Sequence, residues 1–138
     1  MESETRVELQ LKAVVDPQLN IVRIDNNGDI NLFDAKETRY RVTSNQDTDV
    51  TVTVKTKNNW EAKNQEAPES KGIPYQATFR NNGEDKELGS GQNSAKIEKK
   101  NFEDNQCEFS LIFHTEQPIK GYTPGTYADT ITVNVQAE

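Results

Sequence analysis

The sequence predicts an all-β protein built as an immunoglobulin-like sandwich, and three observations support that prediction. Apolar and polar residues alternate with a period of two in several short segments, which is typical of strands with one buried face. Clusters of Asn, Asp, Gly and Pro separate these segments, and no stretch of eleven or more residues has a helical period. The hydrophobic content of the chain is also low, at 32% of residues with a mean hydropathy of -0.92, which suits two sheets with solvated outer faces.

The first predicted strand is the clearest. Val7, Leu9, Leu11, Ala13 and Val15 alternate with polar residues, and only Val14 breaks the pattern. Asp16-Pro17 ends the strand, because proline has no N–H for a ladder and moves the preceding residue out of the helical region. The chain therefore opens with an amphipathic strand that must bury one face against something.

The other strands follow in order, each bounded by turn residues. Residues 19–24 end at the turn cluster 25–29, and Val50, Val52 and Val54 form one face of the cleanest interior strand. The segment 81–84 is a hairpin signal, whereas 89–100 is expected to be a polar loop. The expected strands are 19–24, 30–33, 40–43, 50–56, 73–79, 86–88, 107–113 and 126–135.

Length and charge limit the classes of protein to which the chain can belong. The 138 residues are expected to form one domain, and the net charge of -7 argues against nucleic acid, because phosphate binding needs clustered Lys and Arg. No apolar run approaches the roughly 18 residues of a membrane span. No signal peptide is recognised, so the chain is expected to be either cytosolic or a mature form whose signal was removed. The single Cys107 excludes an internal disulfide and leaves the compartment open.

Residues that could support catalysis or metal binding are few. His114 ends a predicted strand and lacks partner residues nearby in the sequence, and Cys107 alternates with apolar residues as a buried thiol does. The segment 25–29 resembles the start of a calcium loop but lacks the required Gly and Glu, which favours a plain turn. Trp60 is more typical of a core residue than of a sugar-stacking platform. We therefore expect no enzyme activity, no cofactor and no metal.

Three pieces of the chain together resemble a known family. They are the N-terminal strand running into Val15-Asp16-Pro17, the segment Tyr40-Arg41-Val42 followed by 49–54, and the ending Tyr122-Thr123-Pro124-Gly125-Thr126-Tyr127-Ala128-Asp129. In order and spacing they resemble pilins of the chaperone–usher pathway, most closely the alpha-class major subunits of colonisation-factor and cable-pilus type. The middle, residues 63–105, carries no motif of that family.

The resemblance implies an incomplete immunoglobulin-like sandwich that a neighbouring subunit completes by donor-strand complementation. Residues 1–16 would be the N-terminal donor-strand extension and 17–138 the pilin domain. The donor residues would be Val7, Leu9, Leu11, Ala13 and Val15. The acceptor groove would be formed by residues on the first and last sandwich strands, with a floor from the strand at 107–113: Ile21, Ile131, Val133 and Val135 at its sides, and Phe109, Leu111 and Phe113 below.

The resemblance further implies a structural subunit of an adhesive surface fibre, exported through the periplasm. Its partners would be other copies of itself, arranged head to tail, a periplasmic chaperone and an outer-membrane usher, with a host-cell receptor as a further partner. Two alternatives stay open. One is a minor or tip adhesin that binds through loops around Trp60 or residues 89–100, and the other is a self-contained extracellular immunoglobulin-like binding module.

Overall fold

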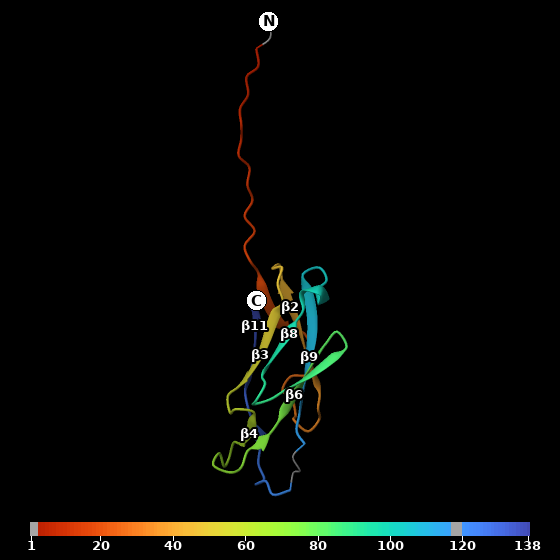
Figure 1. The fold of residues 1–138 in the computed structure, drawn as a ribbon. Helices are drawn as coiled ribbons and strands as arrows, with labels where there is room; N and C mark the ends of the chain where they lie inside the picture. The colour runs from red at the N-terminus through yellow and green to blue at the C-terminus, as the bar shows by residue number, and fades with distance from the viewer. Residues whose placement is uncertain (1–2, 117–119) are drawn as a thin grey trace.

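The computed structural model describes residues 3–116 and 120–138, so Met1, Glu2 and residues 117–119 lie outside it. It is all-β with antiparallel pairing, apart from one short 3-10 helix, η1 (Lys99–Asn101). Figure 1 shows an elongated body of strands with a long N-terminal segment projecting from one end. The strands are β1 (Leu19–Arg23), β2 (Glu37–Ser44), β3 (Val50–Thr56), β4 (Glu61–Asn64), β5 (Ile73–Pro74), β6 (Gln76–Asn81), β7 (Glu84–Leu88), β8 (Ser94–Ile97), β9 (Gln106–His114), β10 (Tyr127–Ala128) and β11 (Ile131–Ala137).

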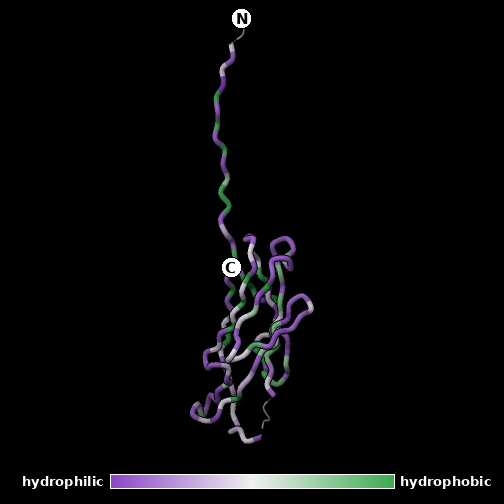
Figure 2. Tube along the Cα trace, viewed as in Figure 1, coloured by the Kyte–Doolittle hydropathy of each residue, from purple (hydrophilic) through white to green (hydrophobic). Residues whose placement is uncertain are grey.

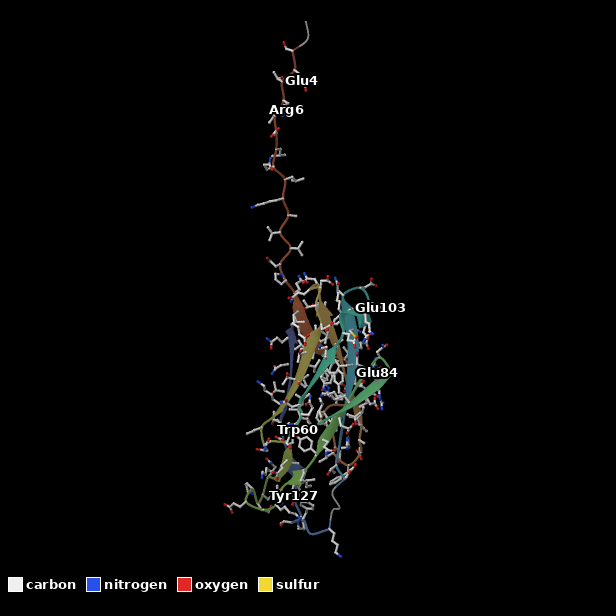
Figure 3. The ribbon with its side chains drawn as sticks, viewed as in Figure 1. Glu4, Arg6, Trp60, Glu84, Glu103 and Tyr127 are labelled. Atoms are coloured by element: carbon white, nitrogen blue, oxygen red, sulfur yellow. The ribbon has the colours of Figure 1, made fainter. Side chains whose placement is uncertain are left out.

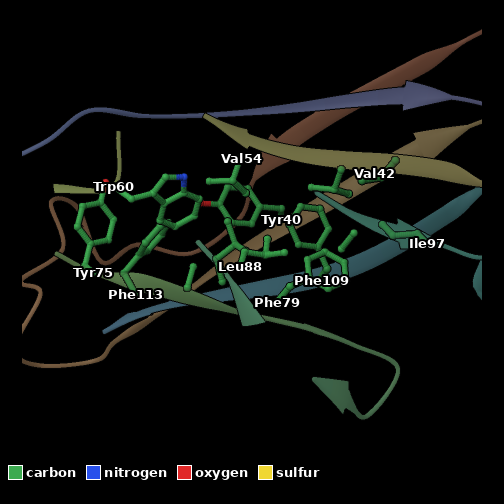
Figure 4. Packing of buried hydrophobic residues seen from close by; sticks show 14 of the residues in the cluster. Tyr40, Val42, Val54, Trp60, Tyr75, Phe79, Leu88, Ile97, Phe109 and Phe113 are labelled. Carbon is green, nitrogen blue, oxygen red and sulfur yellow. The ribbon is translucent and has the colours of Figure 1, made fainter. Parts of the chain in front are cut away.

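The strands form three antiparallel sheets around one core. The largest has the order β1-β2-β9-β6-β7, and the two smaller sheets have the orders β11-β3-β8 and β10-β4-β5. The inward side chains of the sheets meet in a single buried cluster, which Figure 4 shows from close by. This arrangement is consistent with a β-sandwich. Within the described residues, no helix has the length and hydrophobicity needed to cross a membrane.

The centre of the core comes from β3 and β9, where the predicted alternation is confirmed. Val50, Val52 and Val54 of β3 are fully buried, and the residues between them are less so. On β9, Phe109 stacks on Tyr40 with ring centroids 5.0 Å apart and packs against Phe79 at 5.1 Å. Aromatic pairs at these distances add to the stability that burial alone provides. The core thus lies between β3 on one side and β2, β6 and β9 on the other.

Several turns follow directly from local chemistry. Asn82 and Gly83 join β6 to β7, with φ of 53° and 78°. A two-residue hairpin turn of this kind needs positive φ at both positions, which Asn and Gly tolerate best. The predicted hairpin at 81–84 is therefore confirmed.

Four predicted elements differ from the structure, and strand β4 was not predicted. The predicted strand 73–79 is divided at Tyr75 into β5, which pairs with β4, and β6, which pairs with β7 and β9. Residues 30–33 form a turn instead of a strand, because the Asn31 side chain accepts a hydrogen bond from the backbone N–H of Phe33 at 2.9 Å. The predicted loop 89–100 contains β8, whose Ala95 and Ile97 are buried, and η1. The predicted strand 126–135 is divided into β10 and β11, and strand β11 continues to Ala137.

The N-terminal extension, residues 3–18, forms no strand and is exposed throughout. Val7, Leu9 and Leu11 have exposed fractions of 96%, 84% and 90%. Figure 2 shows hydrophobic and hydrophilic residues alternating along this segment as it leads away from the body. The polar side includes an ion pair between Arg6 and Glu8 at 3.0 Å. An isolated extended segment of this kind contributes nothing to the core of its own chain.

Candidate functional site

The candidate site consists of two strand edges, β1 in the five-stranded sheet and β11 in the sheet β11-β3-β8. Among the described residues, β1 pairs only with β2, and β11 pairs only with β3. Each strand therefore has one side whose N–H and C=O groups have no strand beside them. The two strands come close to each other in space, and Figure 1 shows them on the same flank of the body. Unpaired strand edges of this kind are templates for pairing with a further strand.

The apolar side chains of these two strands are only half-buried. Leu19 and Ile21 on β1 pack against the core cluster, as do three alternate residues of β11, which are Ile131, Val133 and Val135. Thr132 and Asn134, between the three β11 residues in sequence, are exposed, and so is Thr130 just before the strand. The odd-numbered residues of β11 therefore face inward, as expected from the sequence. Their partial exposure contrasts with the complete burial of Val52 and Val54 on the adjacent strand β3.

The structure separates the predicted groove residues into two groups. Ile21, Ile131, Val133 and Val135 lie on the two edge strands. Phe109, Leu111 and Phe113 lie on β9, which is separated from β1 by β2, and all three are buried within the core. Strand β2 brings two other residues nearer to the edge, because Val42 is opposite Ile21 and Tyr40 is opposite Arg23. The sequence predicted a strand at 40–43 but gave neither residue a role in the groove. The alternation of Thr38, Tyr40 and Val42 is the signal that could have found them.

A carboxylate fixes the far end of β1. Asp25 accepts hydrogen bonds from the Arg23 guanidinium at 2.8 and 2.9 Å and from the backbone N–H groups of Arg39 at 2.8 Å and Asn27 at 3.0 Å. The Arg23 hydrogen bonds, followed by those of the backbone, hold the pKa of Asp25 well below its ordinary value. The predicted turn at 25–29 is thus a loop organised by Asp25, which joins β1 to β2.

A second carboxylate fixes the start of β11. The Tyr75 hydroxyl donates to Asp129 at 2.6 Å, and Asp129 also accepts from the backbone N–H groups of Asn58 and Thr130. Burial, and then this hydrogen bond, raises the pKa of Tyr75 far above its ordinary value. Asp129 therefore ends the short β10 and sets the position from which β11 continues toward the open flank.

The remaining sequence candidates lie away from these edges. Cys107 is a buried free thiol that accepts a hydrogen bond from Asn81, and burial raises its pKa. His114 Nε2 lies 2.7 Å from Glu87 Oε1 and 3.2 Å from Thr78 Oγ1. Trp60 is 5% exposed and packs against Tyr75, with ring centroids 5.6 Å apart, so its ring faces are covered. Among the described residues, no group of three or more His, Cys, Asp and Glu side chains is placed to hold a metal ion.

A pocket of about 490 Å³ is lined by parts of both segments named for the adhesin alternative, the surroundings of Trp60 and residues 89–92. Its lining includes Trp60, residues 89–92, Tyr75, Glu87 and His114. The pocket has hydrogen-bonding groups, but its two aromatic residues, Trp60 and Tyr75, are buried and offer little ring surface on which a sugar could stack.

No protein-family model matches the chain, and no curated protein matches it.

Proposed function

We propose that this protein is a structural pilus subunit that polymerises head to tail by donor-strand complementation. In this proposal the body is an incomplete immunoglobulin-like sandwich, and residues 7–15 of one copy complete the sandwich of the next. The observation that carries the proposal is the presence, in one chain, of an exposed amphipathic extension and two open strand edges with half-buried apolar side chains.

The extension and the two edges are chemically complementary. Some Cα atoms of β1 and β11 lie within 8 Å of one another, whereas a strand between them needs roughly 9.5 Å, so the two strands would have to move apart to admit a donated strand. That strand would then supply the N–H and C=O partners that both edges lack. Its odd-numbered apolar residues would cover Ile21, Val133 and their neighbours, and its even-numbered polar residues would face solvent. Burying each Leu-sized side chain would stabilise the contact by roughly 1.5–3 kcal/mol. A contact of this kind between different surfaces of identical copies does not close on itself and produces a filament.

The proposal also assigns partners and location. A body with two open edges and a partly exposed core is prone to aggregation before assembly, so it requires a protein that covers the flank in the meantime. A periplasmic chaperone would do this, and an outer-membrane usher would then exchange it for the next subunit. The product would be an adhesive fibre on the cell surface. Its receptor would be set by side chains on the outer faces.

A synthetic donor peptide tests the proposal directly. The acceptor is the full chain carrying Leu9→Asp and Leu11→Asp, because its own extension can no longer insert. A peptide with the sequence of residues 5–16 should raise the melting temperature of this acceptor by several degrees at saturation, since a ligand that binds only the folded state stabilises it. The matched control is the same peptide with both leucines replaced by Asp. Equal melting temperatures with both peptides would contradict the proposal.

The pocket beside Trp60 supports a second candidate function, an adhesin that binds a small polar ligand such as a glycan. A glycan screen with the assembled protein and with a Gln92→Ala variant separates the two functions. Gln92 lines the pocket and is remote in sequence from both edge strands. Glycan binding that depends on Gln92 would favour the adhesin. If no glycan binds, the structural pilus subunit is favoured. A stable monomer that ignores the donor peptide would favour the self-contained module.

A further inference from the structure

One asparagine holds the root of the N-terminal extension. The Asn45 side chain accepts a hydrogen bond from the backbone N–H of Gln18 at 2.6 Å and donates one to the backbone carbonyl of Asp16 at 2.9 Å. The backbone N–H of Asn45 donates to the carbonyl of Gln18 at 3.3 Å. Both polar atoms of one side chain therefore bind the backbone on either side of Pro17.

Asn45 is itself held firmly. The adjacent Ser44 is buried, pairs with Leu19 at the start of β1, and donates its backbone N–H to the carbonyl of Asn105 at 2.9 Å. The Gln18–Asn45 hydrogen bonds thus extend the β1–β2 ladder beyond Leu19. Pro17 adds stiffness, because its φ is fixed and it disfavours a helical conformation at Asp16. The extension consequently leaves the body along the line of β1, as Figures 1 and 3 show.

This direction decides which groove the extension can reach. The proposed groove of its own chain would lie beside β1, so the extension could enter it only by reversing direction within residues 16–18, as a hairpin. Asn45 binds the backbone at both ends of that segment and holds it extended. A second copy placed beyond the end of the body requires no reversal. Insertion into the chain's own groove would have a high effective concentration, since the two parts are linked, and would compete with assembly at any dilution.

We infer that Asn45 is a positioning residue that prevents the extension from folding back and so commits it to a second copy of the chain. This inference rests on the proposed function, because it presupposes the groove. Asn45→Ala removes both side-chain hydrogen bonds and should allow a closed monomer, in which the extension occupies its own groove. Asn45→Asp keeps the acceptor for Gln18 but loses the donor to Asp16, and it should give a smaller effect.

The test measures how tightly a fluorescent peptide of residues 5–16 binds the full chain at nanomolar chain concentration. A chain whose groove is already occupied binds the peptide less tightly, because the apparent Kd is the intrinsic Kd divided by the fraction of chains with an open groove. Loss of two hydrogen bonds predicts binding weakened roughly 5- to 30-fold in Asn45→Ala. Asn93→Ala is the matched control, since Asn93 is exposed, and only its backbone carbonyl accepts a hydrogen bond in the described structure.

A second pair of variants distinguishes a positioning role of Asn45 from a general effect of its substitution on the stability of the body. In the chain carrying Leu9→Asp and Leu11→Asp the extension cannot enter any groove, so adding Asn45→Ala should leave peptide binding unchanged. Equal weakening in both backgrounds would overturn the inference while leaving the groove intact. Unchanged binding in both backgrounds would overturn it as well. Absence of peptide binding by every chain would overturn both the inference and the proposed function.

Discussion

Residues 7–15 and strand β3 have the same kind of sequence but opposite surroundings. Both alternate apolar and polar residues with a period of two. On β3, all three valines are fully buried between β11 and β8. In the extension, Val7, Leu9 and Leu11 are almost fully exposed. The pattern therefore shows that a segment can form a half-buried strand, but whether the partner is in the same chain depends on the rest of the structure.

The edge strand β11 lies between these two extremes. Its inward residues are half-buried, as expected of a strand with β3 on one side and no strand among the described residues on the other. With a donated strand in place, the apolar side chains of the extension and of β11 would both become more buried, as those of β3 are. The following variants test this view, beginning with the largest expected effect.

The largest effect is expected at β3. Val54→Asp places a charge in a fully buried position with no partner, which should destabilise the fold by roughly 3–5 kcal/mol. Urea unfolding followed by circular dichroism measures the change. Lys55→Asp, at the exposed neighbouring position, is the control and should change stability by at most about 0.5 kcal/mol. A folded Val54→Asp chain of normal stability would mean that β3 is not the centre of the core.

The corresponding change in the extension should act only on assembly. Leu11→Asp alters a residue that is 90% exposed, so the unfolding curve of the single chain should not change. Contact with a second copy should weaken by roughly 1.5–3 kcal/mol, seen as loss of polymer in analytical ultracentrifugation. Gln10→Asp, on the polar side, should assemble nearly normally. Equal effects of the two variants on assembly would contradict insertion of the odd-numbered face.

A smaller, kinetic effect is expected at Ala13, the small residue of the apolar face. Ala13→Leu should leave the stability of the single chain unchanged because the position is exposed. In the acceptor, the extra volume has to be accommodated during insertion, at a cost on the order of 1 kcal/mol, and subunit addition should slow several-fold. Light scattering during assembly measures the rate, with Lys12→Ala as the control. Faster assembly by Ala13→Leu would indicate a roomier groove than proposed.

The smallest effect concerns how β1 is anchored. Because the pKa of Asp25 is lowered in the folded state, its stabilising contribution is present above the ordinary pKa near 4 and is lost as the pH falls through the lowered value. Unfolding curves from pH 7 to pH 2 should therefore show a steeper acid loss in the wild type than in Asp25→Asn, with the difference in stability narrowing toward pH 2. Asp47→Asn is the control. Parallel curves for wild type and Asp25→Asn would contradict the assigned ionisation.

The sequence predicted the segments in which local pattern and burial agree. The correctly predicted segments include β3, β9 and the Asn82-Gly83 hairpin, because alternation specifies a strand and the turn residues specify a hairpin. The prediction for residues 30–33 was wrong because apolar residues at 30, 32 and 33 suggested a strand, whereas the side chain of Asn31 stabilises a turn. Strand β8 was missed because its burial depends on pairing with β3, more than forty residues away in the sequence.

The candidate site was predictable only in part for a similar reason. The inward face of β11 followed from its alternation, which placed Ile131, Val133 and Val135 together. The order of strands within the sheet did not follow, and it places Tyr40 and Val42 between β1 and the predicted floor residues on β9. The role of Asn45 depends on the register of β1 against β2, which no local pattern in the sequence specifies.

The alignment of the extension with β1 has a mechanical consequence. Tension applied to the extension acts along the length of β1 and loads its five residue pairs with β2 in shear, all at once. A strand pulled at a right angle would instead unzip one pair at a time under a much lower force. If subunits are joined through this segment, stretching the fibre would therefore load the body in the direction in which the β1–β2 pairing resists most.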